Sequence, residues 1–256
     1  MNDDDQDLAA APEWPEIVRK IRARTPARIL ANRGAAYSTQ MGLDLRGAHA
    51  SAVDAVWTEF DLEKDFAPDF IAKWDLFQVS SQAETKSQFL LRPDLGRTLS
   101  SAARSLITER CNPAPDFQIV IGDGLSRAAV AAQVPAVFPL VLQRARARGW
   151  SIGQGFAVRY CRVGIMNDIG DLLSPRVLVL LIGERPGLAT AESLSAYLGY
   201  RPRSGHTDAD RNLISNIHAR GVRVEEAADR IVNLAAQMLA LKLSGTAVKE
   251  SVRQLL

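Results

Sequence analysis

Residues that bind metals or form disulfides are scarce in this chain of 256 residues, which has two cysteines and three histidines. Cys111 and Cys161 are too few for a disulfide framework, and both stand beside apolar runs, as buried free thiols do. This favours a reducing, intracellular compartment. His49, His206 and His218 are widely separated and form no Cys/His cluster, so we expect no dedicated metal site.

Neither sign of charge dominates, and the formal net charge is +2. This near-balance removes the electrostatic argument for binding nucleic acid or a membrane surface. The N-terminus carries Asp3–Asp5 instead of the basic start of a secretory signal, and we expect residues 1–12 to form a mobile acidic tail. The apolar run at 177–182 is too short to cross a bilayer, so no membrane contact is expected.

Residues 13–77 show helical patterns and no convincing strand. Apolar residues recur three and four positions apart within 41–57, and a shorter segment at 70–74 places its apolar residues on one face. Pro15 suits the first turn of an earlier helix. We therefore expect an N-terminal helical domain at 13–77.

Residues 78–256 alternate between strand and helix patterns. Segment 177–182 is apolar at every position, which is typical of a strand covered on both faces. Short links between segments favour an α/β fold with a mostly parallel, Rossmann-like sheet flanked by helices. The predicted strands are 117–121, 156–163, 177–182 and 213–217. The predicted helices are 94–107 with Asp94 as N-cap, a short one from Ser126 that restarts at Pro135, 165–173, 192–198, and 225–243 with Gly245 as C-cap.

Ligands of such sheets bind beyond the carboxyl ends of the strands. Three segments meet this condition: 122–125, the chain from 163 onward, and 183–187. Residues 122–125 follow a strand and open a helix, so they could bring a ligand to backbone amides or simply form a tight turn. They lack the G-x-G-x-x-G pattern and a P-loop lysine, which makes the nucleotide signal weak.

Glu184 and Arg185 follow the most apolar predicted strand. Burial of either charge without a partner is costly, so each should meet a ligand, a partner chain or the other residue. Ser215 and Asn216 could bond a ligand amide or cap the next loop. No Ser-His-Asp set and no G-x-S-x-G motif can be identified. Ligand-type loops without a catalytic set indicate a binding subunit, or an enzyme completed by a partner.

Six segments resemble the small (light) subunit of ethanolamine ammonia-lyase. They keep the family's order over about 15–245, and the pair LIGERPGL and DRNLISNI is the most specific. The segments are TPARI at 25–29, LRPDLGR at 91–97, IVIGDGLS at 119–126, LIGERPGL at 181–188, ESLSAY at 192–197 and DRNLISNI at 210–217.

The resemblance implies an enzyme that converts ethanolamine to acetaldehyde and ammonia by adenosylcobalamin radical chemistry. In that family the substrate and the radical centre lie in a large subunit with a TIM-barrel fold, and the small subunit helps to hold the cofactor at the interface. The implied partner is this large subunit in a hetero-oligomer, and the chain alone should be inactive, without catalytic residues of its own. The implied location is the cytoplasm, or the protein-shelled microcompartment that encloses this enzyme in many bacteria.

Three positions match the family's cobalamin contacts: Val163, Glu184 and Leu213. Leu213 stands where relatives often have cysteine, so it can offer a backbone or van der Waals contact but no thiol. The residues alone leave two alternatives open. One is an architectural subunit without cofactor contact, and the other is a stand-alone enzyme that acts on a nucleotide or sugar phosphate through residues 122–124.

Overall fold

The computed structural model describes residue 16, residues 39–187 and residues 190–250. By its internal contacts the chain divides into two compact units, Met1–Ala50 and Ser51–Leu256.

Helix α2 (Thr39–Trp57) confirms the helical pattern at 41–57 and contains the division between the two units. Apart from residue 16, the helix expected near Pro15 lies outside the described residues, as does the acidic tail. The domain limits 1–12, 13–77 and 78–256 therefore stay predictions.

The second unit is built on one six-stranded sheet with the order β1-β3-β2-β4-β5-β6. The first four strands in this order are parallel, β5 is antiparallel to β4, and β6 is antiparallel to β5. The predicted α/β class and mostly parallel sheet are confirmed. The strands are β1 (Phe77–Ser80), β2 (Phe117–Gly122), β3 (Phe156–Arg159), β4 (Val177–Gly183), β5 (Leu194–Tyr200) and β6 (Asn212–Ile217).

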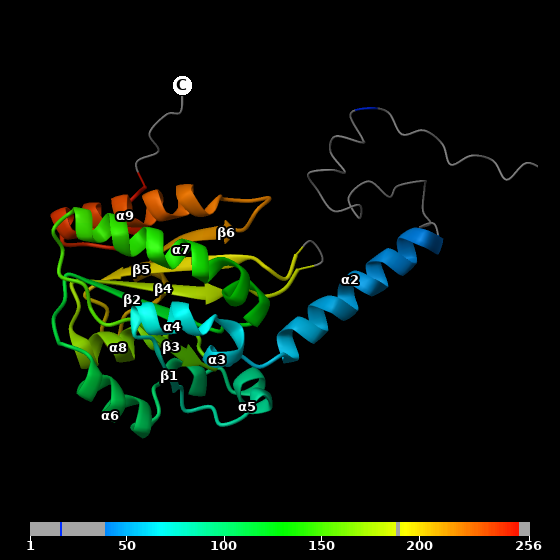
Figure 1. Ribbon diagram of the computed structural model, residues 1–256, viewed down its shortest axis with the longest axis horizontal. Helices are drawn as coiled ribbons and strands as arrows, with labels where there is room; N and C mark the ends of the chain where they lie inside the picture. Colours follow the sequence, from blue (N-terminus) through cyan, green and yellow to red (C-terminus); the bar gives the residue numbers. More distant parts are fainter. Residues whose placement is uncertain (1–15, 17–38, 188–189, 251–256) are drawn as a thin grey trace, which may run out of the picture. The chain divides into compact units, whose positions relative to one another are not determined.

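Helices cover both faces of this sheet (Figure 1). On one face α7 (Arg127–Ala147) and α9 (Val224–Leu241) pack together and bury the larger core with β2, β4 and β5. On the other face α6 (Ser101–Arg110) packs against β1, and α8 (Ile165–Leu173) packs against β4, over a second core. The loops that follow the parallel strands are thus left together at one edge of the sheet.

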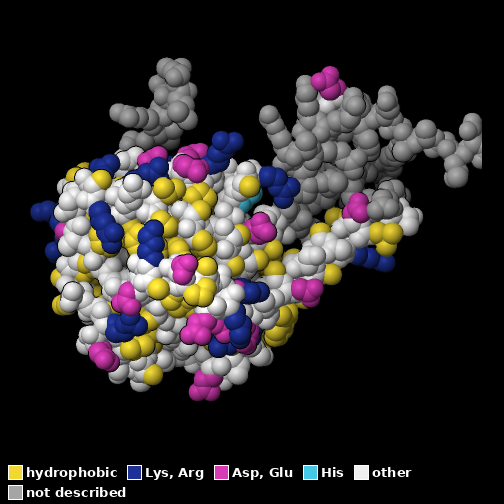
Figure 2. All heavy atoms as spheres, in the orientation of Figure 1, with side chains coloured by type: hydrophobic (Ala, Val, Ile, Leu, Met, Phe, Trp, Pro, Cys, Tyr) yellow, Lys and Arg dark blue, Asp and Glu magenta, His cyan; other side chains and the backbone are white. Residues whose placement is uncertain are grey.

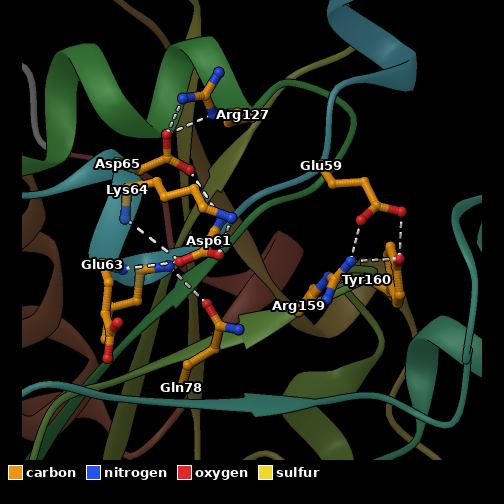
Figure 3. Close-up of polar contacts among 10 residues, drawn as sticks. Glu59, Asp61, Glu63, Lys64, Asp65, Gln78, Arg127, Arg159 and Tyr160 are labelled. Atoms are coloured by element: carbon orange, nitrogen blue, oxygen red, sulfur yellow. Dashed lines mark hydrogen bonds and ion pairs between the residues drawn. The ribbon is translucent and has the colours of Figure 1, made fainter.

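Polar and aromatic contacts fasten the segment before β1 to α7. Asp65, whose side chain is fully buried, forms an ion pair with Arg127 at the start of α7 (Figure 3). Rings from α4 meet Phe138 edge to face at 5.7 and 6.1 Å. These contacts hold two short helices, α3 (Leu62–Asp65) and α4 (Pro68–Trp74), and α4 confirms the helix expected at 70–74.

The helix predicted at 192–198 is wrong, because this segment forms strand β5. Leu194, Ala196 and Leu198 alternate along it and enter the core under α7 and α9. This alternation is the two-residue period of a strand, and it outweighs the helix-forming tendency of the individual residues. Strand β1 was not predicted, since its four residues are too few for a clear pattern.

Two prolines lie inside α7, which is one continuous helix, so the predicted short helix with a restart at Pro135 is wrong. Pro135 is exposed, and Pro139 is partly exposed one turn later on the same side. Water can therefore reach the carbonyl groups that lose their helical hydrogen bonds. Among the described helices, α7 alone is long and apolar enough to cross a membrane, and this run was not predicted from the sequence. Half of its most apolar stretch is buried inside the molecule.

The start of the helix predicted at 94–107 is also wrong. A 3-10 turn, η2 (Leu95–Arg97), comes first, and α6 begins after its N-cap Ser100. The Ser100 hydroxyl accepts a hydrogen bond from the Ala103 amide at 3.1 Å, whereas Asp94 forms an exposed ion pair with Arg92.

Two element ends differ from the prediction because of left-handed residues. β3 stops at Arg159, not at 163, since Tyr160 has a φ of 57°. α9 ends at Leu241 and its C-cap is Lys242, which has a φ of 58°, so the C-cap predicted at Gly245 is wrong. The remaining short elements are α5 (Lys86–Leu91), η3 (Asp208–Asp210) and η4 (Gly245–Ala247).

Candidate functional site

The candidate site lies where two neighbouring parallel strands send the chain to opposite faces of the sheet. After β2 the chain enters α7 on one face, and after β3 it enters α8 on the other. Such a switch point opens a crevice beyond the carboxyl ends of the strands. The loops at 122–126 and 160–164 flank this crevice, and both contain segments predicted from the sequence to contact a ligand.

A pocket of about 360 Å³, here called the strand-end pocket, occupies this crevice and reaches residues of β5 and β6. Its lining includes all three predicted site residues, Val163, Glu184 and Leu213. The structure therefore brings together positions that follow β3, follow β4 and lie within β6. The other lining residues are Gly124, Leu125, Cys161, Arg162, Ile182, Gly183, Arg185, Ser195, Tyr197 and Ser215.

Val163 and Leu213 give the strand-end pocket apolar surface. Val163 is half-buried in the loop between β3 and α8, and Leu213 leaves 46% of its surface exposed. Alternate residues of a strand point to opposite faces, so Leu213 and Ser215 face the pocket while Ile214 enters the core. An exposed leucine in a pocket offers a contact surface for the apolar part of a ligand or partner.

The Glu184 carboxylate joins the ends of three strands. Its oxygens accept hydrogen bonds from the Ser193 hydroxyl at 2.8 Å, the Ser195 hydroxyl at 2.6 Å and the backbone amide of Asn216 at 2.9 Å. In the described part of the chain no ion pair joins it to Arg185, the local partner considered from the sequence. A carboxylate has about four acceptor positions, so one remains for the pocket.

Gly124 and Gly183 let two loops meet backbone to backbone. Gly124 has a φ of 56°, and a Cβ there would lie 2.2 Å from the Gly183 carbonyl oxygen. A Cβ on Gly183 would lie 2.1 Å from the Ser126 carbonyl oxygen. The Leu125 amide donates to the Gly183 carbonyl at 3.1 Å, and the Ser126 hydroxyl caps α7 by accepting from the Ala129 amide at 3.1 Å. Because these amides are already bonded, the geometry favours a tight turn over a phosphate cradle.

Asp123 is buried beneath the strand-end pocket and holds the loop after β3. Its carboxylate accepts from the Tyr160 amide at 2.8 Å and from the Cys161 amide at 2.7 Å. Burial raises the pKa of Asp123 to about 6, although these bonds and the charge of Lys86 oppose the rise. The Tyr160 hydroxyl also donates to Glu59 at 2.8 Å (Figure 3). Cys161 and the two residues after it line the strand-end pocket, so Asp123 positions the wall that this loop forms.

A second pocket of about 620 Å³, here called the arginine pocket, meets the first at Arg162 and Val163. It lies beside η2, the start of α8 and the loop at 204–211. Its two acids are already engaged, since Asp168 pairs with Arg104 and Asp208 pairs with Arg211. The rest of its lining is Arg97, Thr98, Gly164, Asn167, Ser204, Gly205, His206 and Thr207.

The two pockets offer binding groups but no self-contained catalytic set. Among the described residues, no group of three or more His, Cys, Asp or Glu side chains could hold a metal ion. Cys161 lines the strand-end pocket, yet its burial raises the pKa of the thiol well above its ordinary value and disfavours the reactive thiolate. The hydroxyl, backbone and apolar groups suit a ligand with an amide-fringed, apolar body.

Three contributors to this site were not predicted from the sequence. Ser195 and Tyr197 were missed because their segment was taken as a helix. The alternation of Leu194 with its neighbours would have placed both on the sheet face opposite the larger core. Asp123 was noted only as part of a glycine loop. Its position directly after a mostly apolar strand was a signal for a buried, hydrogen-bonded acid.

Fold and pockets together define an α/β chain with a binding site at the carboxyl edge of a mostly parallel sheet. Residues 15–249 match the family described as ethanolamine ammonia-lyase light chain (EutC). The chain therefore belongs to the ethanolamine ammonia-lyase light chain family, which confirms the resemblance found in its motifs.

Individual relatives agree with this membership. The chain is 40% identical over 243 residues to the ethanolamine ammonia-lyase small subunit of Clostridium perfringens, covering 94% of this chain and 80% of the relative. It is 41% identical over 237 residues to the small subunit of Rhodopseudomonas palustris, covering 91% and 90%. With that of Clostridium acetobutylicum the identity is 36% over 235 residues, covering 91% and 95%.

Proposed function

We propose that this chain is the small subunit of an adenosylcobalamin-dependent ethanolamine ammonia-lyase and forms one wall of the cofactor site, at an interface with a large TIM-barrel subunit. One observation carries the proposal: a single pocket joins Val163, Glu184 and Leu213, the positions at which the family's cobalamin contacts are expected. Membership of the family supports the reaction, the conversion of ethanolamine to acetaldehyde and ammonia.

The size and chemistry of the strand-end pocket fit a shared cofactor site. Drug-sized ligands fill pockets of roughly 300–1,000 Å³, and adenosylcobalamin is several times larger than such ligands. A pocket of about 360 Å³ can therefore hold only one side of it, and a partner chain must cover the rest. The hydroxyl groups of Ser195, Tyr197 and Ser215 can bond the amide side chains of the corrin ring, and Leu213 can contact its apolar edge.

In this proposal the residues of the chain bind and orient the cofactor. When bound, adenosylcobalamin supplies the radical chemistry. Val163 and Leu213 contact the apolar parts of the ring, and Glu184 accepts from a corrin amide because three hydrogen bonds fix its carboxylate. The substrate and the catalytic groups would lie in the large subunit, so the chain alone should be inactive. The proposed location is the cytoplasm, or a protein-shelled microcompartment within it.

A matched pair of leucine variants tests cofactor contact. The chain is coexpressed with its large subunit, and the purified complex is titrated with adenosylcobalamin while visible absorbance is followed. Leu213→Asp places a charge in the strand-end pocket and should weaken binding about tenfold or more, roughly 1.4 kcal/mol. Leu91→Asp is the control, because Leu91 is 79% exposed and lines neither pocket.

Two results would contradict the proposal. If Leu213→Asp binds adenosylcobalamin as tightly as Leu91→Asp in an intact complex, the chain is an architectural subunit. If the large subunit alone binds the cofactor and releases acetaldehyde at the full rate, this chain has no required part in the reaction. Calorimetric titration of the isolated chain with nucleotides and sugar phosphates tests the stand-alone alternative, which requires heat of binding.

A further inference from the structure

Three arginines line the region where the two pockets adjoin. Arg162 lines both pockets, Arg97 lines the arginine pocket, and Arg185 lines the strand-end pocket. In the described part of the chain no acidic side chain forms an ion pair with any of the three. Other arginines of this unit are paired, for example those at 104, 110, 127, 144, 159, 176, 211 and 230. Over the face shown in Figure 2, basic and acidic side chains are interspersed.

The side chains of two of these arginines pack closely against neighbouring glycines. A Cβ on Gly96 would lie 2.6 Å from Arg162 Cγ, and a Cβ on Gly164 would lie 2.8 Å from Arg97 Cγ. The Arg162 guanidinium stacks 4.3 Å from the Phe89 ring centroid and donates to the Phe89 carbonyl at 3.1 Å. Its Nε is buried, without a hydrogen-bond partner among the described residues. The aliphatic stems of Arg97 and Arg162 are thus closely packed, and the Arg162 guanidinium keeps an N–H group that can donate to a ligand.

The grouping of like charges is unfavourable in the free chain. Burial lowers the pKa of Arg162, and the charges of Arg185 and Arg97 lower it further, against the opposing charge of Asp123. Asp123 is itself bonded to two backbone amides, and both acids of the arginine pocket are engaged by other arginines. An anion placed between the three guanidinium groups would relieve their repulsion. Thr98, which carries a hydroxyl donor, lines the same space, and guanidinium groups with a hydroxyl donor are a set well suited to phosphate.

We propose that Arg97, Arg162 and Arg185 bind the phosphodiester of the cobalamin nucleotide tail. This inference rests on the proposed function. The cofactor is the favoured source of the anion because the arginine pocket adjoins the strand-end pocket, with Arg162 and Val163 lining both. A corrin ring seated on Val163, Glu184 and Leu213 could extend its tail into the arginine pocket. The amides around the ring are neutral, so the phosphodiester is the one fixed negative charge that the arginines would recognise.

The experiment compares two corrinoids that differ in this anion. The purified complex with the large subunit is titrated with adenosylcobalamin and with adenosylcobinamide, which lacks the nucleotide tail and its phosphodiester. The test variant is the double substitution Arg97→Gln with Arg185→Gln, since both residues are exposed and glutamine keeps most of the side-chain stem. Binding of adenosylcobalamin should weaken about tenfold or more, and binding of adenosylcobinamide should stay the same. Arg92→Gln, at an exposed arginine outside both pockets, should change neither affinity.

A conservative variant separates charge from shape. Arg97→Lys with Arg185→Lys keeps both charges, so it should recover most of the preference for adenosylcobalamin. Equal losses for the two corrinoids, or no loss for either, would overturn the inference. The inference would also be overturned if less large subunit copurified with the glutamine variant while its preference for adenosylcobalamin over adenosylcobinamide stayed the same. The arginines would then contact an acidic surface of the partner. If the wild-type complex binds neither corrinoid, the proposed function itself fails. If the wild type binds both and the arginine variants bind them with the same affinities, only the inference about the arginines fails.

Discussion

Glu184 shows how a residue can belong to a binding site and to the fold at once. The sequence predicts that this carboxylate meets a ligand, a partner or Arg185. In the structure it meets the hydroxyl of Ser193, just before β5, the hydroxyl of Ser195 in β5 and the backbone amide of Asn216 in β6. The hydrogen bonds hold the antiparallel edge of the sheet against the end of β4. Glu184→Ala would therefore confuse loss of a cofactor contact with loss of structure, and Leu213 is the cleaner probe.

Asp123 should make the stability of the chain depend on pH in an unusual direction. Burial raises its pKa from 3.8 to about 6, so between about pH 4 and 6 the folded chain binds more protons than the unfolded chain. Stability therefore falls as the pH rises through this window. The contribution of this proton to the free energy of unfolding is full below about pH 4 and lost above about pH 6. It amounts to about 3 kcal/mol, because each unit by which the pKa moves is worth roughly 1.4 kcal/mol. Asn at this position has no proton to lose.

Urea unfolding of the wild-type chain and of Asp123→Asn at pH 4.5 to 7 measures this effect. The free energy of unfolding of the wild type, relative to the variant, should decrease as the pH rises. Asp116→Asn is the control, since hydrogen bonds from Ser151 and the Arg176 guanidinium hold the pKa of Asp116 below its ordinary value. Its contribution is lost only at lower pH, so its difference from wild type should be constant in this range. A constant difference for Asp123→Asn as well would refute the assignment.

At the scale of elements, the sequence predicted the long periodic segments and failed where packing decided. Strands β2 and β4 are apolar at nearly every position, and α9 has an unbroken apolar stripe, so all three were found. Strand β5 was mistaken for a helix because serine, alanine and leucine tolerate both structures, and its pairing with β4 and β6 is decided by contacts distant in sequence. Helix α7 continues through its prolines because they lie on the side of the helix that meets water. The helix propensities of single residues do not predict which side that is.

The loop between β2 and α7 should be intolerant of any side chain at Gly124. Gly124→Ala forces a Cβ to 2.2 Å from the Gly183 carbonyl oxygen and also strains a left-handed backbone. Gly149→Ala is the matched control, because Gly149 has a φ of 74° but nothing within 4 Å of its Cβ position. The control should cost about 1–2 kcal/mol from the backbone strain alone. Gly124→Ala should cost about 1–3 kcal/mol more, from overpacking.

Urea titration of both glycine variants gives the comparison. If the two substitutions destabilise the chain equally, the two loops do not meet as closely as described. A loss of adenosylcobalamin binding with unchanged stability in Gly124→Ala would instead show that this loop serves the ligand more than the fold.

At the scale of the whole molecule, the sequence yielded the class of fold and the edge that carries the site. Alternating strands and helices predicted a parallel sheet, and the rule for its carboxyl edge selected the segments that surround both pockets. The strand order and the antiparallel β5 and β6 could not be predicted, since they depend on pairings between distant segments. Val163, Glu184 and Leu213 came from the resemblance. Only the arrangement of the strands shows that these three residues line one pocket.

The same geometry predicts where cofactor binding protects the backbone from hydrogen exchange. In the complex with the large subunit, adenosylcobalamin should slow exchange at 161–164, 184–187 and 213–216, because these segments line the pockets at the carboxyl edge. The loop at 148–155 precedes β3 at the opposite edge of the sheet, so its exchange should not change. Exchange is followed by mass spectrometry with and without the cofactor. Protection at both edges alike would indicate a general tightening of the complex, and protection at 148–155 alone would place the ligand on the wrong side of the sheet for this proposal.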